Sequence, residues 1–231
     1  MRVYLLAHTP DPEKTIAMAA KLCYSPSNIG DLKGLVEGSD QTDFLKKIIG
    51  MGHTSVLEHA NFTFGVEGIS RATSHQLVRH RLASYSQQSQ RYVKVGEQFE
   101  YVTPHTISAD DEKKLKFDDA VRAIHKIYGE LVDSGIPAED ARYILPNAAA
   151  TKIIITMNAR ELTHFFTLRC CERAQWEIRE MACEMLKLAR DIVPALFESA
   201  GPGCVRGKCT EGAMTCGRTE EIREKFKNLS S

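Results

Sequence analysis

A strand followed at once by a capped helix occurs twice in this sequence, and this pattern restricts the fold more than any other feature. Residues 61–69 alternate between apolar and polar side chains, as a half-buried strand does, and Ser70 is placed to cap a helix that runs to about residues 81–82. Residues 151–157 are rich in β-branched side chains, which predicts a buried strand, and Asn158 is placed to cap the next helix. The chain therefore mixes strands with helices.

Other periodic segments predict the remaining elements. They are strands over 2–8 and near 99–102, and helices over about 12–24, 40–51, 158–169 and 175–198. Ser108 and Asp111 form a start like a capping box for a long helix that stops at Gly135, and Pro137 opens a short helix. Residues 84–90 show no apolar period, which predicts an irregular loop.

The length of 231 residues fits one large domain, because a single core can serve up to about 250–300 residues. We expect this domain over residues 1–200. Residues 201–231 are expected to form a glycine- and cysteine-containing tail that ends in a short charged helix.

The charge balance limits the kinds of partner. Thirty basic and thirty acidic residues cancel, so no global field attracts the chain to nucleic acid or to an anionic membrane. Any anion site must be local. No apolar run approaches the roughly 20 residues that span a bilayer, and the N-terminus lacks the features of a signal peptide. Seven scattered cysteines, an odd number, favour a reducing cytoplasm over a secreted disulfide framework.

The segment 79–92 is the best candidate for such a local anion site. It contains three arginines, a histidine, three serines and three glutamines, with little that is apolar to pack. On the predicted helix Gln76, Arg79 and His80 share one face, while Arg81 points elsewhere. Arginines at a helix end and beyond a hydroxyl-rich loop are suited to binding a phosphate through paired hydrogen bonds. The alternative is a solvated basic surface.

A second candidate group surrounds the helix that follows Asn158. Arg160 and His164 are neighbours at i and i+4, and Arg169 lies beside the apolar stripe of the helix. An arginine near a core keeps its charge and needs a carboxylate or a bound anion. For Asn158 the alternative is a plain N-cap, and for His164 it is an exposed helix residue.

Histidines and cysteines give weaker signals, and we expect no metal site. His53, Glu58 and His59 match no helical zinc motif, so structural histidines are the favoured interpretation. Cys204, Cys209 and Cys216 lack a paired short spacing, which favours free thiols over a zinc site or disulfides. Cys170, Cys171 and Cys183 fall in helical segments, where cysteine acts as a small hydrophobe.

Several motifs together resemble one enzyme family, the flavin-dependent thymidylate synthases. The family signature of an Arg-His-Arg triplet, two serines and an Arg-Tyr pair matches Arg79-His80-Arg81, Ser84, Ser89 and Arg91-Tyr92. The similarity continues in residues 53–59, 141–146, 158–161, 168–169 and 174–177, in the expected order. It covers about residues 40–198.

This resemblance implies an activity and its partners. It implies a methyltransferase of dTMP biosynthesis, which reductively methylates dUMP to dTMP with 5,10-methylenetetrahydrofolate as carbon donor and NADPH as reductant. FAD carries the electrons. It also implies an α/β (α+β) fold with a curved, mainly antiparallel sheet and long helices. The expected assembly is a homotetramer whose active sites form between subunits.

The resemblance also assigns site residues. Those expected to contact dUMP are Gln76, Arg79, Gln87, Gln88, Ser89, Gln90, Arg91, Arg142 and Arg169. Those expected to contact FAD are Ser55, Arg79, His80, Arg81, Gln87, Asn158, Arg160 and His164. Family members often carry Asn-Glu where this chain has Ser86-Gln87, and a small residue, commonly glycine, where it has Gln90.

The resemblance implies roles for three arginines, and their charge fits these roles. Arg91 and Arg142 are expected to hold the dUMP phosphate, and Arg169 is expected to be catalytic by stabilising negative charge on the uracil ring. The cofactors supply reducing equivalents that no side chain can supply. The alternative from another class is a non-catalytic nucleotide- or RNA-binding protein that uses the basic loop 79–91, although the balanced net charge argues against it.

Overall fold

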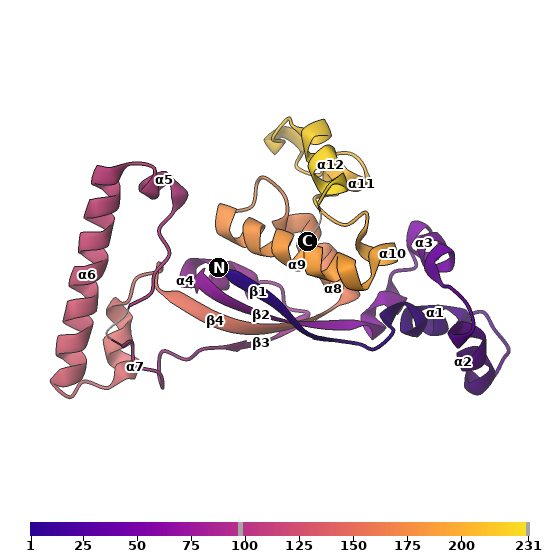
Figure 1. Ribbon diagram of the computed structural model, residues 1–231, viewed down its shortest axis with the longest axis horizontal. Coiled ribbons are helices and arrows are strands. Elements are labelled where there is room, and N and C mark those ends of the chain that lie inside the picture. The colour runs from indigo at the N-terminus through magenta and orange to yellow at the C-terminus, as the bar shows by residue number, and fades with distance from the viewer. Residues whose placement is uncertain (97–98, 230–231) are drawn as a thin grey trace. The chain divides into compact units, whose positions relative to one another are not determined.

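The computed structural model describes residues 1–96 and 99–229, so the last two residues of the predicted tail lie outside it (Figure 1). Within these described residues, four strands form one sheet in the order β1-β2-β4-β3, and their bounds are β1 (Arg2–His8), β2 (Asn61–Ser70), β3 (Ala83–Gln87) and β4 (Ala150–Asn158). The Thr9 amide donates to the Asn61 carbonyl, whereas Gly68 lies against Met1, so β1 and β2 are antiparallel. A mixed fold of helices and antiparallel sheet is therefore confirmed.

Helices make up the larger part of the regular structure. Their bounds are α1 (Pro12–Leu22), α2 (Ile29–Glu37), α3 (Thr42–Gly50), α4 (Arg71–Leu77), α5 (His105–Ser108), α6 (Asp111–Asp133), α7 (Ala138–Ala141), α8 (Ala159–Arg169), α9 (Trp176–Ile192), α10 (Pro194–Phe197), α11 (Gly203–Arg206) and α12 (Thr219–Lys227). The 3₁₀ turns are η1 (Ser55–His59), η2 (Arg142–Ile144) and η3 (Gly212–Met214). Helix α2 was not predicted, although Asn28 caps it by accepting from the Asp31 amide.

The helix after Ser70 is shorter than predicted. Ser70 does cap it, by accepting from the Thr73 amide at 3.1 Å, but the helix ends at Leu77. The prediction that Gln76, Arg79 and His80 share a helix face is therefore wrong. The Tyr85 hydroxyl donates to the Leu77 carbonyl at 2.9 Å, so a contact from the next strand satisfies the helix end.

The predicted loop over 84–90 is wrong in its first half, because residues 83–87 form β3. The side chains of Ala83, Tyr85 and Gln87 are half-buried and those of Ser84 and Ser86 are exposed. This is the period of two that a strand requires, carried by polar side chains that hide it from an apolar pattern. Residues 88–90 do lie outside regular structure.

Three other predictions need correction at element ends. Asp110, not Ser108, caps α6, with its carboxylate accepting from the Lys113 amide. The predicted helix over 175–198 breaks before Pro194, which lacks an amide hydrogen and disfavours helical geometry at the preceding residue. The predicted strand near 99–102 is reduced to a single bridge between Tyr101 and Ala149.

Strand β4, predicted as a buried strand, is buried on one face. The side chains of Thr151, Ile153, Ile155 and Met157 are buried, whereas Ile154 is 47% exposed. This alternation is the usual pattern for an antiparallel strand with one face against the core.

Residue contacts divide the chain into two compact units. Unit 1 comprises 1–2, 66–79 and 85–154, and unit 2 comprises 3–65, 80–84 and 155–231. In unit 1 the long helix α6 buries Val121 and Tyr128. In unit 2 the core includes Phe197, whose ring lies 5.6 Å from that of Phe62 and 5.8 Å from that of Phe166. Burial of each such ring contributes about 1.5–3 kcal/mol.

No helix within residues 1–96 and 99–229 is long and apolar enough to cross a membrane.

Candidate functional site

The predicted site residues fall into the two units, which we describe separately. Those in unit 1 are Gln76, Arg79, Gln87, Gln88, Ser89, Gln90, Arg91 and Arg142. Those in unit 2 are Ser55, His80, Arg81, Asn158, Arg160, His164 and Arg169.

Unit 1 contains a polar pocket of about 460 Å³ with two arginines in its wall. The described lining residues are Arg71, His75, Gln90, Arg142, Tyr143, Leu145, Pro146 and Asn147. They include no carboxylate. Arg142 is held by a hydrogen bond from its Nε to the Glu139 carbonyl at 3.0 Å. A pocket with two guanidinium groups and no acid in its described wall is suited to an anion.

Arg71 was not predicted as a site residue, yet it lines this pocket with part of its guanidinium group buried. Its Nε is buried and has no hydrogen-bond partner among the described residues, while its Nη2 donates to the Gln88 carbonyl at 3.2 Å. Burial, and then the nearby charge of Arg142, lower the pKa of Arg71. A buried donor without an acceptor is costly. A bound anion would supply both the acceptor and the opposite charge.

Arg91, a predicted phosphate ligand, forms an ion pair with Glu139 that the sequence analysis did not predict. Its Nε contacts the carboxylate of Glu139, 48 residues away, and the two side chains are 54% and 43% exposed. An ion pair with this exposure contributes only about 0–1 kcal/mol. A phosphate dianion would therefore compete well for Arg91. The nearby turn is held by Ser89, whose Oγ accepts from the Arg91 amide at 3.1 Å.

The other predicted residues of unit 1 are held by local contacts. Gln87 donates from Nε2 to Thr151 Oγ1 at 3.2 Å, and the Gln76 Nε2 donates to the Ala72 carbonyl at 3.3 Å. Arg79 is exposed in the turn after α4. Residues 88–90 also line a second cavity of about 240 Å³.

In unit 2, three polar side chains form a buried chain of hydrogen bonds. His80 Nδ1 lies 3.0 Å from Glu161 Oε1, and Arg169 Nε donates to His80 Nε2 at 3.0 Å. The side chains of His80 and Glu161 are 3% and 7% exposed. Because the arginine can only donate, Nε2 must be the acceptor, and the histidine proton lies on Nδ1 and is donated to Glu161.

This arrangement keeps His80 neutral. Burial lowers the pKa of His80, the hydrogen bond to Glu161 raises it, and the charges of Arg169 and His164 lower it again, with a net shift downward. Neutral His80 can then accept from Arg169 and fix the plane of its guanidinium. Arg169 lies partly buried at the end of α8, as its spacing from the apolar stripe predicted.

The sequence placed Glu161 only within the motif over residues 158–161. The structure adds the contact with His80, which lies 81 residues away in sequence. No local signal indicates such a partner. Glu161 is the third residue of α8, and its neighbours Ala159 and Leu162 are apolar, which hints that its carboxylate is buried and needs a partner.

Of the other predicted residues of unit 2, Ser55 lies on η1 and Arg160 and His164 lie on α8, two elements that contact each other. Asn158 ends β4, and Arg81 lies between α4 and β3. Asn158 accepts from the Glu161 amide at 2.9 Å, so the alternative role of an N-cap is observed. Arg160 contacts the carboxylate of Glu58 in a half-exposed ion pair. Ser55, His164 and Arg81 are exposed. Together these side chains offer a polar, accessible surface to a large ligand.

Within the described residues no group of three or more histidine, cysteine or acidic side chains is arranged to hold a metal ion. All seven cysteines are free, with Cys170 and Cys204 buried. His53 has a buried Nδ1 without a hydrogen-bond partner among these residues and makes an edge contact with the Tyr24 ring.

Comparison with known proteins identifies the family. The model of the family described as "Thymidylate synthase complementing protein" matches residues 4–195. A flavin-dependent thymidylate synthase of Geobacter sulfurreducens is 58% identical over 231 residues, covering 100% of both chains. The chain belongs to this family. Proteins of the same name from Clostridium tetani and Pyrococcus furiosus are 46% and 44% identical, covering 97% and 100% of this chain and 96% and 98% of their own.

The family membership confirms the resemblance drawn from the Arg79–Tyr92 motif. All the predicted site residues lie inside the matched range of 4–195. The tail beyond it lies within the full-length match to the Geobacter relative. Nothing in these comparisons supports the alternative of a non-catalytic RNA-binding protein.

Proposed function

We propose that this protein is a flavin-dependent thymidylate synthase that reductively methylates dUMP to dTMP. The carbon donor is 5,10-methylenetetrahydrofolate and the reductant is NADPH. The similarity to enzymes of this name over the whole chain is the observation that carries the proposal.

The pocket of unit 1 fits the phosphate of dUMP. Arg71 and Arg142 provide two cationic groups, and the unpaired Nε of Arg71 gains an acceptor when an anion binds. Arg91, in its weak surface pair, would add a third contact. The glutamines and Ser89 of residues 87–90, with Gln76 and Arg79, would complete the nucleotide site.

Arg169 would act on the uracil ring. Its guanidinium is oriented through His80 before substrate binds, and it stays cationic in partly buried surroundings. A fixed positive group stabilises negative charge that develops on the ring in the transition state, and little reorganisation is needed when the reaction occurs. Glu161 holds the His80 tautomer that makes this orientation possible.

The surface formed by Ser55, Asn158, Arg160 and His164 fits the polar portions of FAD, because its hydroxyl, amide, guanidinium and imidazole groups are accessible or partly so. His80, Arg81, Arg79 and Gln87 complete the proposed flavin set. When bound, FAD supplies the transfer of reducing equivalents from NADPH. The residues of this chain bind and orient the flavin.

We also propose a homotetramer with active sites between subunits. Tyr143 borders the arginine pocket with 84% of its surface exposed, and Tyr92 is 77% exposed. Exposed aromatic side chains of this size often mark a surface that another chain covers. Within each subunit, residues 1–200 are proposed as the single catalytic domain, followed by the tail 201–231.

A spectrum tests the activity most directly. Purified protein is expected to be yellow, to lose its flavin absorbance on reduction by NADPH, and to change its flavin spectrum when dUMP is added. Formation of dTMP should require dUMP, the folate and NADPH together. Protein that takes up no FAD would refute the proposal.

A further inference from the structure

We propose that the C-terminal segment 203–229 positions Arg169, and that Glu172 is the residue through which it acts. This inference rests on the proposed function, in which Arg169 acts on the uracil ring. Glu172 lies in the loop between α8 and α9, three residues after Arg169. It is thus a positioning residue, distinct from the groups that touch substrate.

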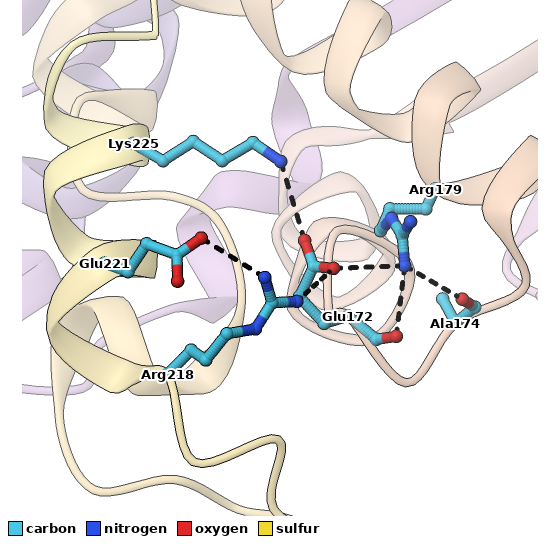
Figure 2. Close-up of polar contacts among 6 residues, drawn as sticks. All are labelled: Glu172, Ala174, Arg179, Arg218, Glu221 and Lys225. Atoms are coloured by element: carbon cyan, nitrogen blue, oxygen red, sulfur yellow. Dashed lines mark hydrogen bonds and ion pairs between the residues drawn. The ribbon is translucent and has the colours of Figure 1, made fainter.

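Glu172 is surrounded by three cationic side chains (Figure 2). Its Oε2 lies 2.9 Å from Arg218 Nη2 and 3.4 Å from Arg179 Nη1, and its Oε1 lies 3.5 Å from Lys225 Nζ. The Glu172 side chain is 14% exposed. Arg218 and Lys225 belong to the C-terminal segment, whereas Arg179 belongs to α9. One carboxylate therefore ties the end of the chain to the loop that follows Arg169.

Arg179 also holds the backbone of this loop. Its Nη1 donates to the Glu172 carbonyl at 3.0 Å and to the Ala174 carbonyl at 3.4 Å (Figure 2). The same guanidinium thus fixes both the main chain and the side chain of Glu172. Loss of the carboxylate would release Arg218 and Lys225 and weaken the hold of Arg179.

The C-terminal segment contacts α8 on the other side of Arg169 as well. Arg206 Nη2 donates to Thr167 Oγ1 at 3.1 Å, two residues before Arg169. Contacts at Thr167 and Glu172 therefore flank Arg169 along the chain. This placement limits how far the end of α8 can move.

The segment that makes these contacts is itself well anchored. Arg223 of α12 donates to the carbonyl of Cys204 in α11 and to that of Gly207 directly after this helix, both at 2.9 Å. Arg190 of α9 donates to the carbonyls of Phe226 at 2.8 Å and Leu229 at 2.9 Å. These contacts do not involve Glu172, so the segment stays docked when Glu172 changes.

Position matters because Arg169 Nε donates to His80 Nε2 at 3.0 Å, and a hydrogen bond depends steeply on distance and direction. A shift of the loop by about 1 Å would break it, and errors of this size in a catalytic group reduce rates by about 10²-fold. Flavin binding and flavin reduction do not require Arg169 in the proposed mechanism. A positioning effect should therefore separate these steps from dTMP formation.

The test compares Glu172→Gln with Glu184→Gln in the full-length protein. Glu184 is a matched control because it pairs with Lys187 on the surface of α9 and is 51% exposed. We expect kcat for dTMP formation to fall about 10- to 100-fold in Glu172→Gln, with flavin content and NADPH-driven flavin reduction unchanged. The control should stay within about twofold of the unaltered protein. Equal kcat values in the two variants would overturn the inference.

Two substitutions of the more exposed residue Arg218 test the same inference if Glu172→Gln does not fold. Arg218 is 48% exposed, so Arg218→Gln and Arg218→Lys should both fold. We expect kcat to fall about threefold or more in Arg218→Gln and to recover in Arg218→Lys, which keeps the charge. Unaltered kcat in Arg218→Gln contradicts the inference. Absence of flavin binding in the unaltered protein refutes the proposed function instead, so the two failures are distinguishable.

Discussion

The arginine pocket of unit 1 and the Glu161–His80–Arg169 chain of unit 2 both contain arginine side chains. They differ in whether the buried polar groups have hydrogen-bond partners within the protein. Arg71 has a buried Nε without a partner among the described residues, and a second arginine lines the same pocket. Arg169 is held by His80, which is held in turn by Glu161. One region has unsatisfied groups, and the other has its hydrogen bonds in place.

This difference suits the pocket to binding an anion and the hydrogen-bonded chain to orienting Arg169. Arginine does not lose its proton in proteins, so the pocket carries a cost until an anion enters. Binding then relieves that cost, which favours affinity. In the buried chain, the cost of desolvation is offset by hydrogen bonds inside the protein, so the group is in place before any ligand arrives. Substitutions in the two regions should therefore have different consequences.

The largest effect is expected for Arg169→Ala. Removing the oriented cation should lower kcat for dTMP formation by about 10²–10³-fold, because a preorganised charge at the transition state is lost. Flavin should stay bound, since Arg169 is outside the proposed flavin set. The measurements are dTMP formation and the flavin spectrum of the same sample. Turnover close to that of the unaltered protein would remove Arg169 from the catalytic role.

Arg71→Met should show the opposite balance. We expect the KM for dUMP to rise about 10- to 100-fold, because one charge-assisted contact to phosphate is lost. The free energy of unfolding without ligand should fall by less than about 1 kcal/mol, because removal of the buried unpaired Nε offsets loss of the hydrogen bond from Nη2 to the Gln88 carbonyl. Urea unfolding and a dUMP titration of the flavin spectrum measure the two quantities.

The control for Arg71→Met is Arg122→Met on α6, an arginine of the same unit whose side chain is 62% exposed. It should leave both the affinity for dUMP and the stability nearly unchanged. If Arg71→Met destabilises the ligand-free protein by more than about 1 kcal/mol, the buried Nε of Arg71 does not carry the cost of an unpaired donor.

Glu161→Gln should affect both stability and rate, but less strongly. Glutamine can still accept from His80 Nδ1, so the expected loss is the charged part of the hydrogen bond, about 1 kcal/mol of unfolding free energy. The rate of dTMP formation should fall about tenfold, because His80 orients Arg169 less firmly. Urea unfolding and steady-state kinetics provide the measurements. A stable variant with an unchanged rate would show that the buried chain does not orient Arg169.

Local signals explain which parts of the fold were predictable. Ser70 and Asn158 were predicted as caps because the residues needed for capping lie within three positions along the chain. The end of α4 was missed because a tyrosine from the following strand satisfies it. Strand β3 was missed because its two faces differ in burial while its residues are mostly polar.

The candidate site shows the same division. Residue type and order indicated Arg142 and Arg169, but not the groups that surround them. Glu161 is 81 residues from His80, and Glu139 is 48 residues from Arg91, so only the fold brings these pairs together. Arg71 was missed because its importance lies in burial without a partner, which no sequence pattern records.

The smallest expected effect is a dependence of stability on pH that traces to His80. Burial and nearby charges hold the pKa of His80 below its usual value of 6.5, so the unfolded chain binds a proton that the folded chain resists. The contribution of neutral His80 to stability is therefore present above about pH 6.5 and is lost as the pH falls below it. Urea unfolding of the unaltered protein and of His80→Gln at pH 5 and pH 7 isolates this term. We expect the stability difference between them to be smaller at pH 5, and a difference that grows on acidification would show that His80 is charged in the folded protein.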